Sequence, residues 1–277
     1  MNAITTLVRR SPLISFLVLT FGLCWGIGAV LKGTPVLAPD GNFLIGVTIA
    51  ALIVTSLTGG RAGLKDLGRR LVRWRVAPHW YAAVFILPVA LIGAVLVLLP
   101  IFGGTPLDWT RQPSPLNTVM LLGFFMIFPF ATPIAEEIGW RGVALPRILA
   151  GRSALTASLI LGVIWSLWHL PVVLSDPALR VPVPFLLTVV PASILFTWVF
   201  VNTRASVFMA VLFHAWFDVM LGYGFAMVSP SDAALTWWLV FAAHAATAIV
   251  VVAIWGPNLV RGESAQLGAR RAEVVAA

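Results

Sequence analysis

The membrane fold of this chain is decided by Pro133-Ile-Ala-Glu-Glu-Ile-Gly-Trp-Arg-Gly-Val-Ala-Leu-Pro-Arg147, which follows directly on the apolar run of residues 118–132. That run is typical of a membrane span, so Glu136 and Glu137 are expected at or inside the membrane boundary. An ionised side chain at the bilayer centre costs roughly 3 kcal/mol on insertion scales. A membrane helix has no structural need for two adjacent carboxylates, and the pair therefore indicates a functional site.

The spacing of charges in this stretch gives the two carboxylates different surroundings. Consecutive residues of a helix point about 100° apart, so Glu136 and Glu137 face different partners. Arg141 lies four residues after Glu137 and can pair with it on one helix face. Glu136 is then left without a local counter-charge. The alternative is a helix end with ordinary surface charges among lipid headgroups, but the apolar context favours a functional site.

The composition predicts an all-α, polytopic membrane protein. Of the 277 residues, 60% are hydrophobic and 10% are charged, and the mean hydropathy is +0.99. In soluble proteins about 25% of residues are charged. We expect a single helical membrane domain over residues 1–256 and a disordered cytoplasmic tail over residues 257–277. The net charge of +8 is explained by basic cytoplasmic loops, so the expected partner is the lipid bilayer and no nucleic acid.

The apolar runs predict a bundle of about eight transmembrane helices. About 20 apolar residues span the hydrocarbon core of a bilayer, and eight runs approach that length. They cover residues 13–31, 42–58, 80–102, 117–138, 154–174, 183–201, 206–226 and 235–255. The first run is longer than the roughly 7–15-residue core of a signal peptide, so we expect it to be retained as a span.

The basic residues predict how these spans are oriented. With both termini on one side, fifteen of the eighteen Lys and Arg residues lie on that side and three on the other. Cytoplasmic loops carry the excess of positive charge, so we predict a multi-pass protein of the cell membrane with both termini cytoplasmic. Residues 63–75 alternate leucines with basic residues at helical spacing. We expect a short basic interfacial helix on the anionic leaflet, with binding of a partner protein as the alternative.

Further ionisable residues fall within the predicted spans, where such residues usually mark sites. His169 follows Trp165 in the fifth span, and His214 and Asp218 share one helix face in the seventh. The alternative for His214 and Asp218 is an interhelical hydrogen-bonding clamp. Trp165 is interpreted as a packing residue. His244 in the eighth span has no acid at helical spacing, which favours a structural role.

A buried glutamate, two histidines and an aspartate are suitable for activating water. A carboxylate can act as general base, and a histidine or protonated aspartate can stabilise a tetrahedral oxyanion. Glu136, His169 and His214 could instead ligate a divalent metal such as zinc, whose bound water would be the nucleophile. The sequence contains neither His-Glu-x-x-His nor Gly-x-Ser-x-Gly. Metal-bound and metal-free activation both stay open at this point.

Three motifs in order resemble those of the CPBP family, the intramembrane endopeptidases related to CAAX prenyl proteases and to bacteriocin self-immunity (Abi-type) proteins. They are Glu136-Glu137-x-x-x-Arg141, an aromatic-x-x-x-His motif that ends at His169, and His214-x-x-x-Asp218. The resemblance covers residues 116–222, which we take as the motif-bearing core. In this chain Trp165 replaces the more usual phenylalanine, and Asp218 occupies a position that is often asparagine.

The resemblance implies a role for each motif residue. Glu136 would be the general base and His169 would position the water. His214 and Asp218 would form the oxyanion site, while Glu137 and Arg141 would be a supporting ion pair. An ionised Asp218 cannot donate to an oxyanion, so it is either protonated or acts by orienting His214.

The resemblance also implies a function, a hydrolase that cuts peptide bonds of membrane-associated or lipidated protein substrates. A non-catalytic immunity or scaffold protein of the same fold is the first alternative, but a scaffold does not need Glu136, His169 and His214 together. An ion-coupled transporter would also use intramembrane glutamate and histidine. The absence of an inverted repeat from the sequence argues against a transporter.

Overall fold

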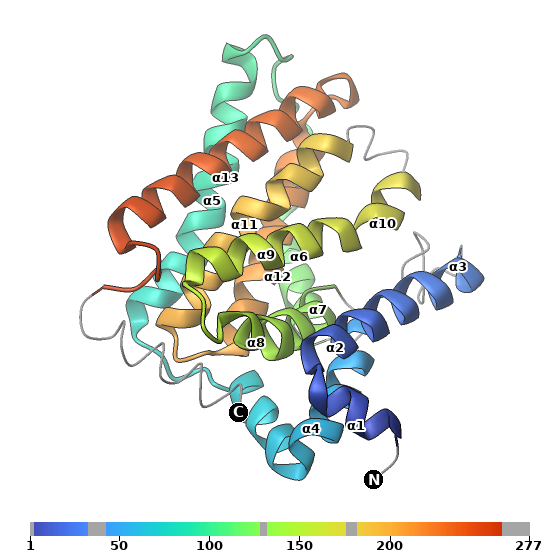
Figure 1. Cartoon of the computed structure of the whole chain (residues 1–277). Helices are drawn as coiled ribbons and strands as arrows, with labels where there is room; N and C mark the ends of the chain where they lie inside the picture. Colours follow the sequence, from blue (N-terminus) through green and yellow to red (C-terminus); the bar gives the residue numbers. More distant parts are fainter. Residues whose placement is uncertain (1–2, 33–42, 128–131, 176–181, 262–277) are drawn as a thin grey trace.

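The structure is a computed structural model that describes residues 3–32, 43–127, 132–175 and 182–261 (Figure 1). All regular secondary structure within these ranges is helical. The longer helices are α2 (Pro12–Phe21), α4 (Ile45–Leu71), α5 (Pro78–Ile101), α6 (Pro115–Ile127), α9 (Ala154–Trp168), α11 (Pro182–Asn202), α12 (Val207–Met227) and α13 (Ala233–Trp255). The shorter ones are α1 (Ala3–Arg10), α3 (Gly28–Leu31), α7 (Thr132–Gly139), α8 (Leu145–Leu149) and α10 (Leu170–Ser175). Two π-helical turns, η1 (Gly22–Ile27) and η3 (Trp140–Ala144), and two 3₁₀ turns, η2 (Trp109–Arg111) and η4 (Pro230–Asp232), connect some of them.

The predicted all-α polytopic membrane fold is confirmed. Six helical segments of the described residues are long and apolar enough to cross a bilayer. They are Pro12–Leu31, Ile45–Leu71, Pro78–Ile101, Val183–Asn202, Val207–Met227 and Pro230–Trp255. Two shorter apolar helices, α6 and α9, fall in the remaining two predicted spans. The orientation of the termini stays a prediction, and residues 262–277 of the predicted tail lie outside the described residues.

The predicted span over residues 154–174 is divided rather than continuous. The predicted span over residues 117–138 falls in α6 and α7, with residues 128–131 outside the described residues, and the span over 154–174 falls in α9 and α10. In the second case the reason is Pro171, which has no N–H to donate to the Leu167 carbonyl four residues earlier. Helix α9 therefore ends at Trp168, and His169 is its C-terminal cap residue. The division places His169 at a helix end, where its side chain can turn toward neighbouring elements.

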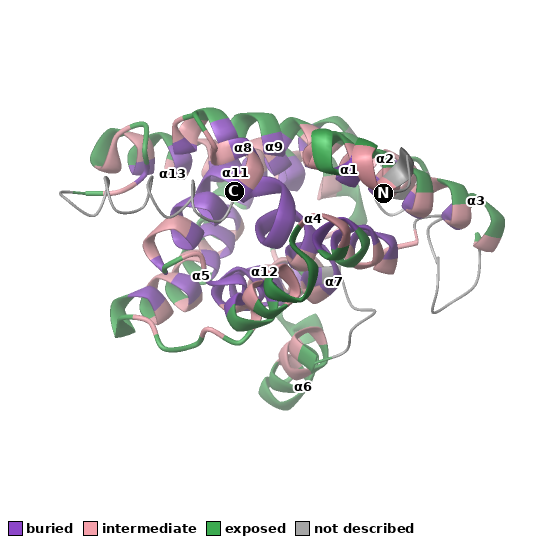
Figure 2. Cartoon of the chain, turned by 60° about the horizontal axis from the view of Figure 1, so that its bottom comes forward, coloured by how far each residue is buried: buried purple, intermediate pink, exposed green. Residues whose placement is uncertain are grey.

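The core of the bundle lies around α11 and α12. In the most apolar 18-residue stretches of these helices 72% and 56% of the residues are buried, against 22–33% in the four outer spans. Figure 2 shows this difference, with buried segments in the middle and exposed faces on the outer helices. The outer faces carry large exposed apolar side chains such as Ile86, Val97 and Val119. This distribution is the one expected of helices that face lipid.

The predicted interfacial helix is the last part of α4. Gly60 has φ +55° and ψ −146°, which interrupts the helix before the basic segment and suits a glycine. The helix then ends at Leu71, four residues before the predicted end at residue 75. Leu67 is only 3% exposed, so part of the apolar face packs on the protein itself and not on lipid. Lys65 and Arg69 are exposed, and their contact with a membrane surface stays a prediction.

Candidate active site

The two predicted carboxylates lie on α7, one turn before a π-helical turn. Glu136, Glu137 and Arg141 are all completely buried. Arg141 belongs to η3, a wider turn of the kind that is frequent at functional sites. Pro146 follows and has no N–H for the Gly142 carbonyl four residues earlier. Arg70 of α4 donates to that carbonyl from Nη2 at 3.0 Å, so the basic segment of α4 is bonded to the turn that carries Arg141.

Glu136 is held through one of its two carboxylate oxygens. Its Oε2 accepts a hydrogen bond from Trp165 Nε1 at 2.6 Å and another from Trp140 Nε1 at 3.1 Å. Its Oε1 is buried and has no hydrogen-bond partner among the described residues. Such an atom is expensive to leave without a partner in a folded protein. The carboxylate is therefore fixed at one oxygen and free to bind water or substrate at the other.

Glu137 joins the first and third motifs. Its Oε1 lies 2.8 Å from Arg141 Nη1 and 2.9 Å from His214 Nδ1. The ion pair with Arg141 is therefore present, and Glu137 also reaches α12, which the sequence did not indicate. The other imidazole nitrogen, His214 Nε2, lies 3.7 Å from Asp218 Oδ2, too far for a hydrogen bond. His214 is thus held by Glu137, and its Nε2 has no hydrogen bond to Asp218.

The guanidinium of Arg141 is covered by aromatic rings. It lies 4.4 Å from the ring centre of Trp165 and 4.5 Å from that of Phe196. A cation over an aromatic face is stabilised by the ring quadrupole, most strongly when water is excluded. The rings and Glu137 together compensate for the burial of this charge. Trp165 therefore contacts both the arginine of the first motif and the carboxylate of Glu136.

His169 approaches the cluster from the end of α9. Its Nδ1 lies 2.8 Å from the Trp165 carbonyl oxygen, so Nδ1 is the protonated nitrogen and Nε2 is left as an acceptor. The imidazole packs against Trp165, Trp168 and Phe185, with ring-centre distances of 5.7, 4.9 and 5.3 Å. In the described part of the chain no hydrogen bond joins His169 to Glu136. The two residues are connected through Trp165, which bonds to both.

His244 lies apart from this cluster. It is buried on α13, with Nδ1 2.6 Å from the Val240 carbonyl oxygen of its own helix and its ring 5.0 Å from that of Phe217. Both contacts are those of a packed core histidine, and a structural role for His244 stays a prediction. Within the described residues no group of three or more His, Cys, Asp or Glu side chains is placed to hold a metal ion. The three candidate ligands Glu136, His169 and His214 therefore do not form such a group.

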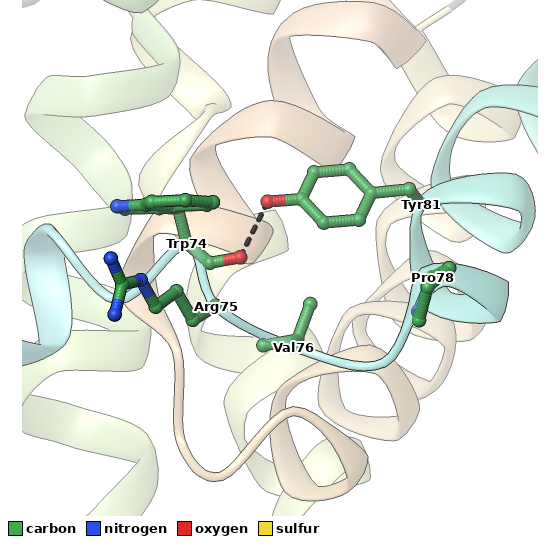
Figure 3. Close-up of a pocket in the computed structure, with 5 residues that line it drawn as sticks. All are labelled: Trp74, Arg75, Val76, Pro78 and Tyr81. Atoms are coloured by element: carbon green, nitrogen blue, oxygen red, sulfur yellow. Dashed lines mark hydrogen bonds between the residues drawn. The ribbon is translucent and has the colours of Figure 1, made fainter.

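The structure also contains a cavity of about 560 Å³ at the end of α4, but it contains no candidate site residue. Trp74, Arg75, Val76, Pro78 and Tyr81 line it (Figure 3). The Tyr81 hydroxyl donates to the Trp74 carbonyl oxygen across this cavity at 2.5 Å. The candidate site is therefore a buried polar cluster, separate from this cavity.

Comparison with known proteins places the three motifs in one family. Residues 118–220 match the family model described as type II CAAX prenyl endopeptidase, Rce1-like. The chain is also 29% identical over 139 residues to CAAX prenyl protease 2 of Methanococcus maripaludis. Both matches support the assignment of this segment to the CPBP family. The similarity covers 47% of this chain and 50% of the archaeal protein, so the chain spans about half the length of that relative.

The CPBP match contains every candidate site residue from Glu136 to Asp218 and leaves His244 outside. Sequence reasoning missed two contacts of Glu136. Trp140 lies four residues after Glu136, as Arg141 does after Glu137, so the same helical spacing could have identified it. The interpretation of Trp165 as a packing residue was incomplete, because its indole also donates to Glu136. That contact joins residues 29 positions apart and had no local signal.

Proposed function

We propose that this chain is a glutamate-dependent intramembrane endopeptidase of the CAAX prenyl protease type, which hydrolyses peptide bonds of membrane-associated or lipidated protein substrates. The observation that carries the proposal is the free Oε1 of Glu136, a buried carboxylate oxygen without a partner among the described residues. A buried base beside two histidines, within the segment that matches the prenyl endopeptidase family, supports hydrolysis more than it supports a scaffold.

The proposed reaction begins at Glu136. Oε1 takes a proton from a water molecule that His169 Nε2 helps to hold, and the water oxygen attacks the carbonyl carbon of the scissile bond. A C–O bond forms and the carbonyl electron pair moves to the oxygen. His214, as an imidazolium whose Nδ1–H is held by Glu137, donates from Nε2 to this oxyanion. When the C–N bond breaks, the proton on Glu136 passes to the leaving amine, which restores the carboxylate.

Glu137 and Arg141 have a supporting role in this proposal. Glu137 holds His214 through Nδ1 at 2.9 Å, so the imidazole presents its Nε2 to the substrate side. In this proposal Glu137 orients His214, while Asp218 supplies a second carboxylate at 3.7 Å from Nε2. Arg141 compensates the charge of Glu137 from the same turn.

The proposal is tested with a panel of membrane-tethered reporter peptides, one of them carrying a prenylated C-terminus. Purified wild type and Glu136→Gln are compared, each with and without a chelator. We expect wild type to cut at least one reporter and Glu136→Gln to lose about 100- to 10,000-fold in kcat, the usual contribution of a general base. Asp108→Asn, a carboxylate-to-amide change in an exposed loop, is the matched control and should keep full activity.

Each arm of this experiment has a different meaning. Activity that survives the chelator supports the glutamate-activated water, and activity lost to the chelator but restored by zinc would assign the water to a metal. A Glu136→Gln variant that cuts as well as wild type would show that the base is wrongly assigned. A wild type that cuts no reporter would favour the scaffold or the transporter.

A further inference from the structure

Two indole N–H groups from different helical elements converge on a single oxygen of Glu136. Trp140 comes from η3 and lies four residues after Glu136, whereas Trp165 comes from α9. Both indoles are buried, with 0% and 4% of the residue exposed. A buried indole usually finds an acceptor for its N–H. Here both indoles use the same acceptor, and neither uses the second oxygen of the carboxylate.

This arrangement is not a general feature of the buried tryptophans of this chain. The indole nitrogen of Trp198, also buried, has no hydrogen-bond partner in the part of the chain that the structure describes. Trp198 packs only by its ring, against Trp80 at 4.8 Å and Trp255 at 5.2 Å. Burial of a tryptophan therefore does not by itself bring a donor to an acceptor in this fold. The convergence at Glu136 is specific to that carboxylate.

Trp165 also connects the remaining groups of the cluster. Its carbonyl oxygen binds His169 Nδ1, and its ring lies 5.5 Å from the ring of His214 and under the guanidinium of Arg141. These contacts restrict the rotation of the indole, so its N–H is aimed at Glu136 before any substrate arrives. Preorganised donors of this kind stabilise charge without reorganising during the reaction.

We propose that Trp140 and Trp165 are positioning residues for Glu136, which hold its Oε2 so that Oε1 stays free and oriented toward the water that it deprotonates. This inference rests on the proposed function, in which Glu136 is the general base. Hydrogen bonds to a carboxylate favour its ionised form, so the two indoles also keep the base ready to accept a proton. Trp165 has the greater effect, because its N–H lies closer, at 2.6 Å against 3.1 Å.

The test compares Trp165→Phe, Trp140→Phe and the matched control Trp198→Phe, each of which keeps an aromatic ring and removes an N–H. On a reporter that wild type cuts, we expect Trp165→Phe to lower kcat about tenfold or more, as for removal of a charge-assisted hydrogen bond, with KM little changed. The acid limb of its pH–kcat profile should move to higher pH, because the protonated carboxylate is no longer disfavoured. Trp140→Phe should show a smaller change of the same kind, and Trp198→Phe none.

A second measurement reports the contacts without turnover. Wild type with ¹⁵N-labelled tryptophan is compared in detergent with Glu136→Gln by NMR of the twelve indole N–H groups. We expect Glu136→Gln to shift most strongly the two signals that disappear in Trp140→Phe and Trp165→Phe. Unmoved signals would overturn the inference whatever the activity. Full activity and an unchanged pH profile in Trp165→Phe would overturn the positioning role alone, whereas an active Glu136→Gln would overturn the proposed function as well.

Discussion

Two buried histidines on neighbouring segments of the chain, His214 on α12 and His244 on α13, have very different surroundings. His214 is bonded to Glu137, which lies 77 positions away on another helix, and has Asp218 on its other side. His244 is hydrogen-bonded to the carbonyl oxygen of Val240 in the preceding turn of its own helix, and its ring packs against that of Phe217. Both are nearly inaccessible, at 6% and 1% exposure. Burial of an ionisable group therefore does not identify the site; the convergence of polar groups from several helices does.

The largest effect is expected at Glu137, whose carboxylate on α7 contacts His214 on α12. Glu137→Gln removes the charge that compensates Arg141, and breaking a buried ion pair costs about 3–5 kcal/mol because one charge is left uncompensated. We expect a loss of stability of that order, measured by denaturant unfolding in detergent. Glu136→Gln is the matched variant, because its amide oxygen still accepts from the indoles of Trp140 and Trp165, and it should cost much less stability.

Equal destabilisation by the two glutamine variants would contradict this division between the neighbouring carboxylates. It would mean that Glu137 and Arg141 are not the pair that holds the turn. The expected result gives Glu137 a structural role and Glu136 a catalytic role, although the two residues are adjacent in the sequence.

The two histidines themselves give the second prediction. His214→Phe should lower kcat/KM by about 100- to 1,000-fold, the usual cost of removing an oxyanion donor, and should leave Glu137 with Arg141 as its partner. His244→Phe should keep kcat/KM, because it removes only a hydrogen bond within its own helix and its ring still packs on Phe217. Cleavage kinetics of both variants check this. An inactive, well-folded His244→Phe would show that α13 belongs to the site.

The parts of this site that the sequence predicted are those set by local spacing. The lengths of the apolar runs predicted the helical spans, and the i, i+4 spacing predicted the contact of Glu137 with Arg141. The bonds from Trp165 to Glu136, from His214 to Glu137 and from Arg70 to Gly142 join residues 29, 77 and 72 positions apart. These depend on how the helices pack, which no local pattern encodes. For the same reason the third motif could be placed on a helix face but not matched to its partner.

The smallest expected effect concerns the link between α4 and the turn that follows the two glutamates. Arg70→Gln removes the donor to the Gly142 carbonyl, which Pro146 cannot replace, and frees Asp66 from its bond to Arg70 Nε at 2.9 Å. A buried carbonyl without a partner costs about 1–3 kcal/mol. We expect a loss of stability in this range, together with a several-fold fall in kcat because Arg141 lies in the same turn.

Arg69→Gln is the matched control for this link. Arg69 is the preceding residue, its side chain is 62% exposed and it lies 3.7 Å from the same Asp66, so removing it costs at most about 1 kcal/mol. If both variants lowered kcat alike, the basic segment would act through its overall charge at the membrane surface. A fall confined to Arg70→Gln would show that the segment acts through one hydrogen bond to the turn beside Arg141. Only the second outcome would show that the end of α4 supports the geometry of the site through a direct contact.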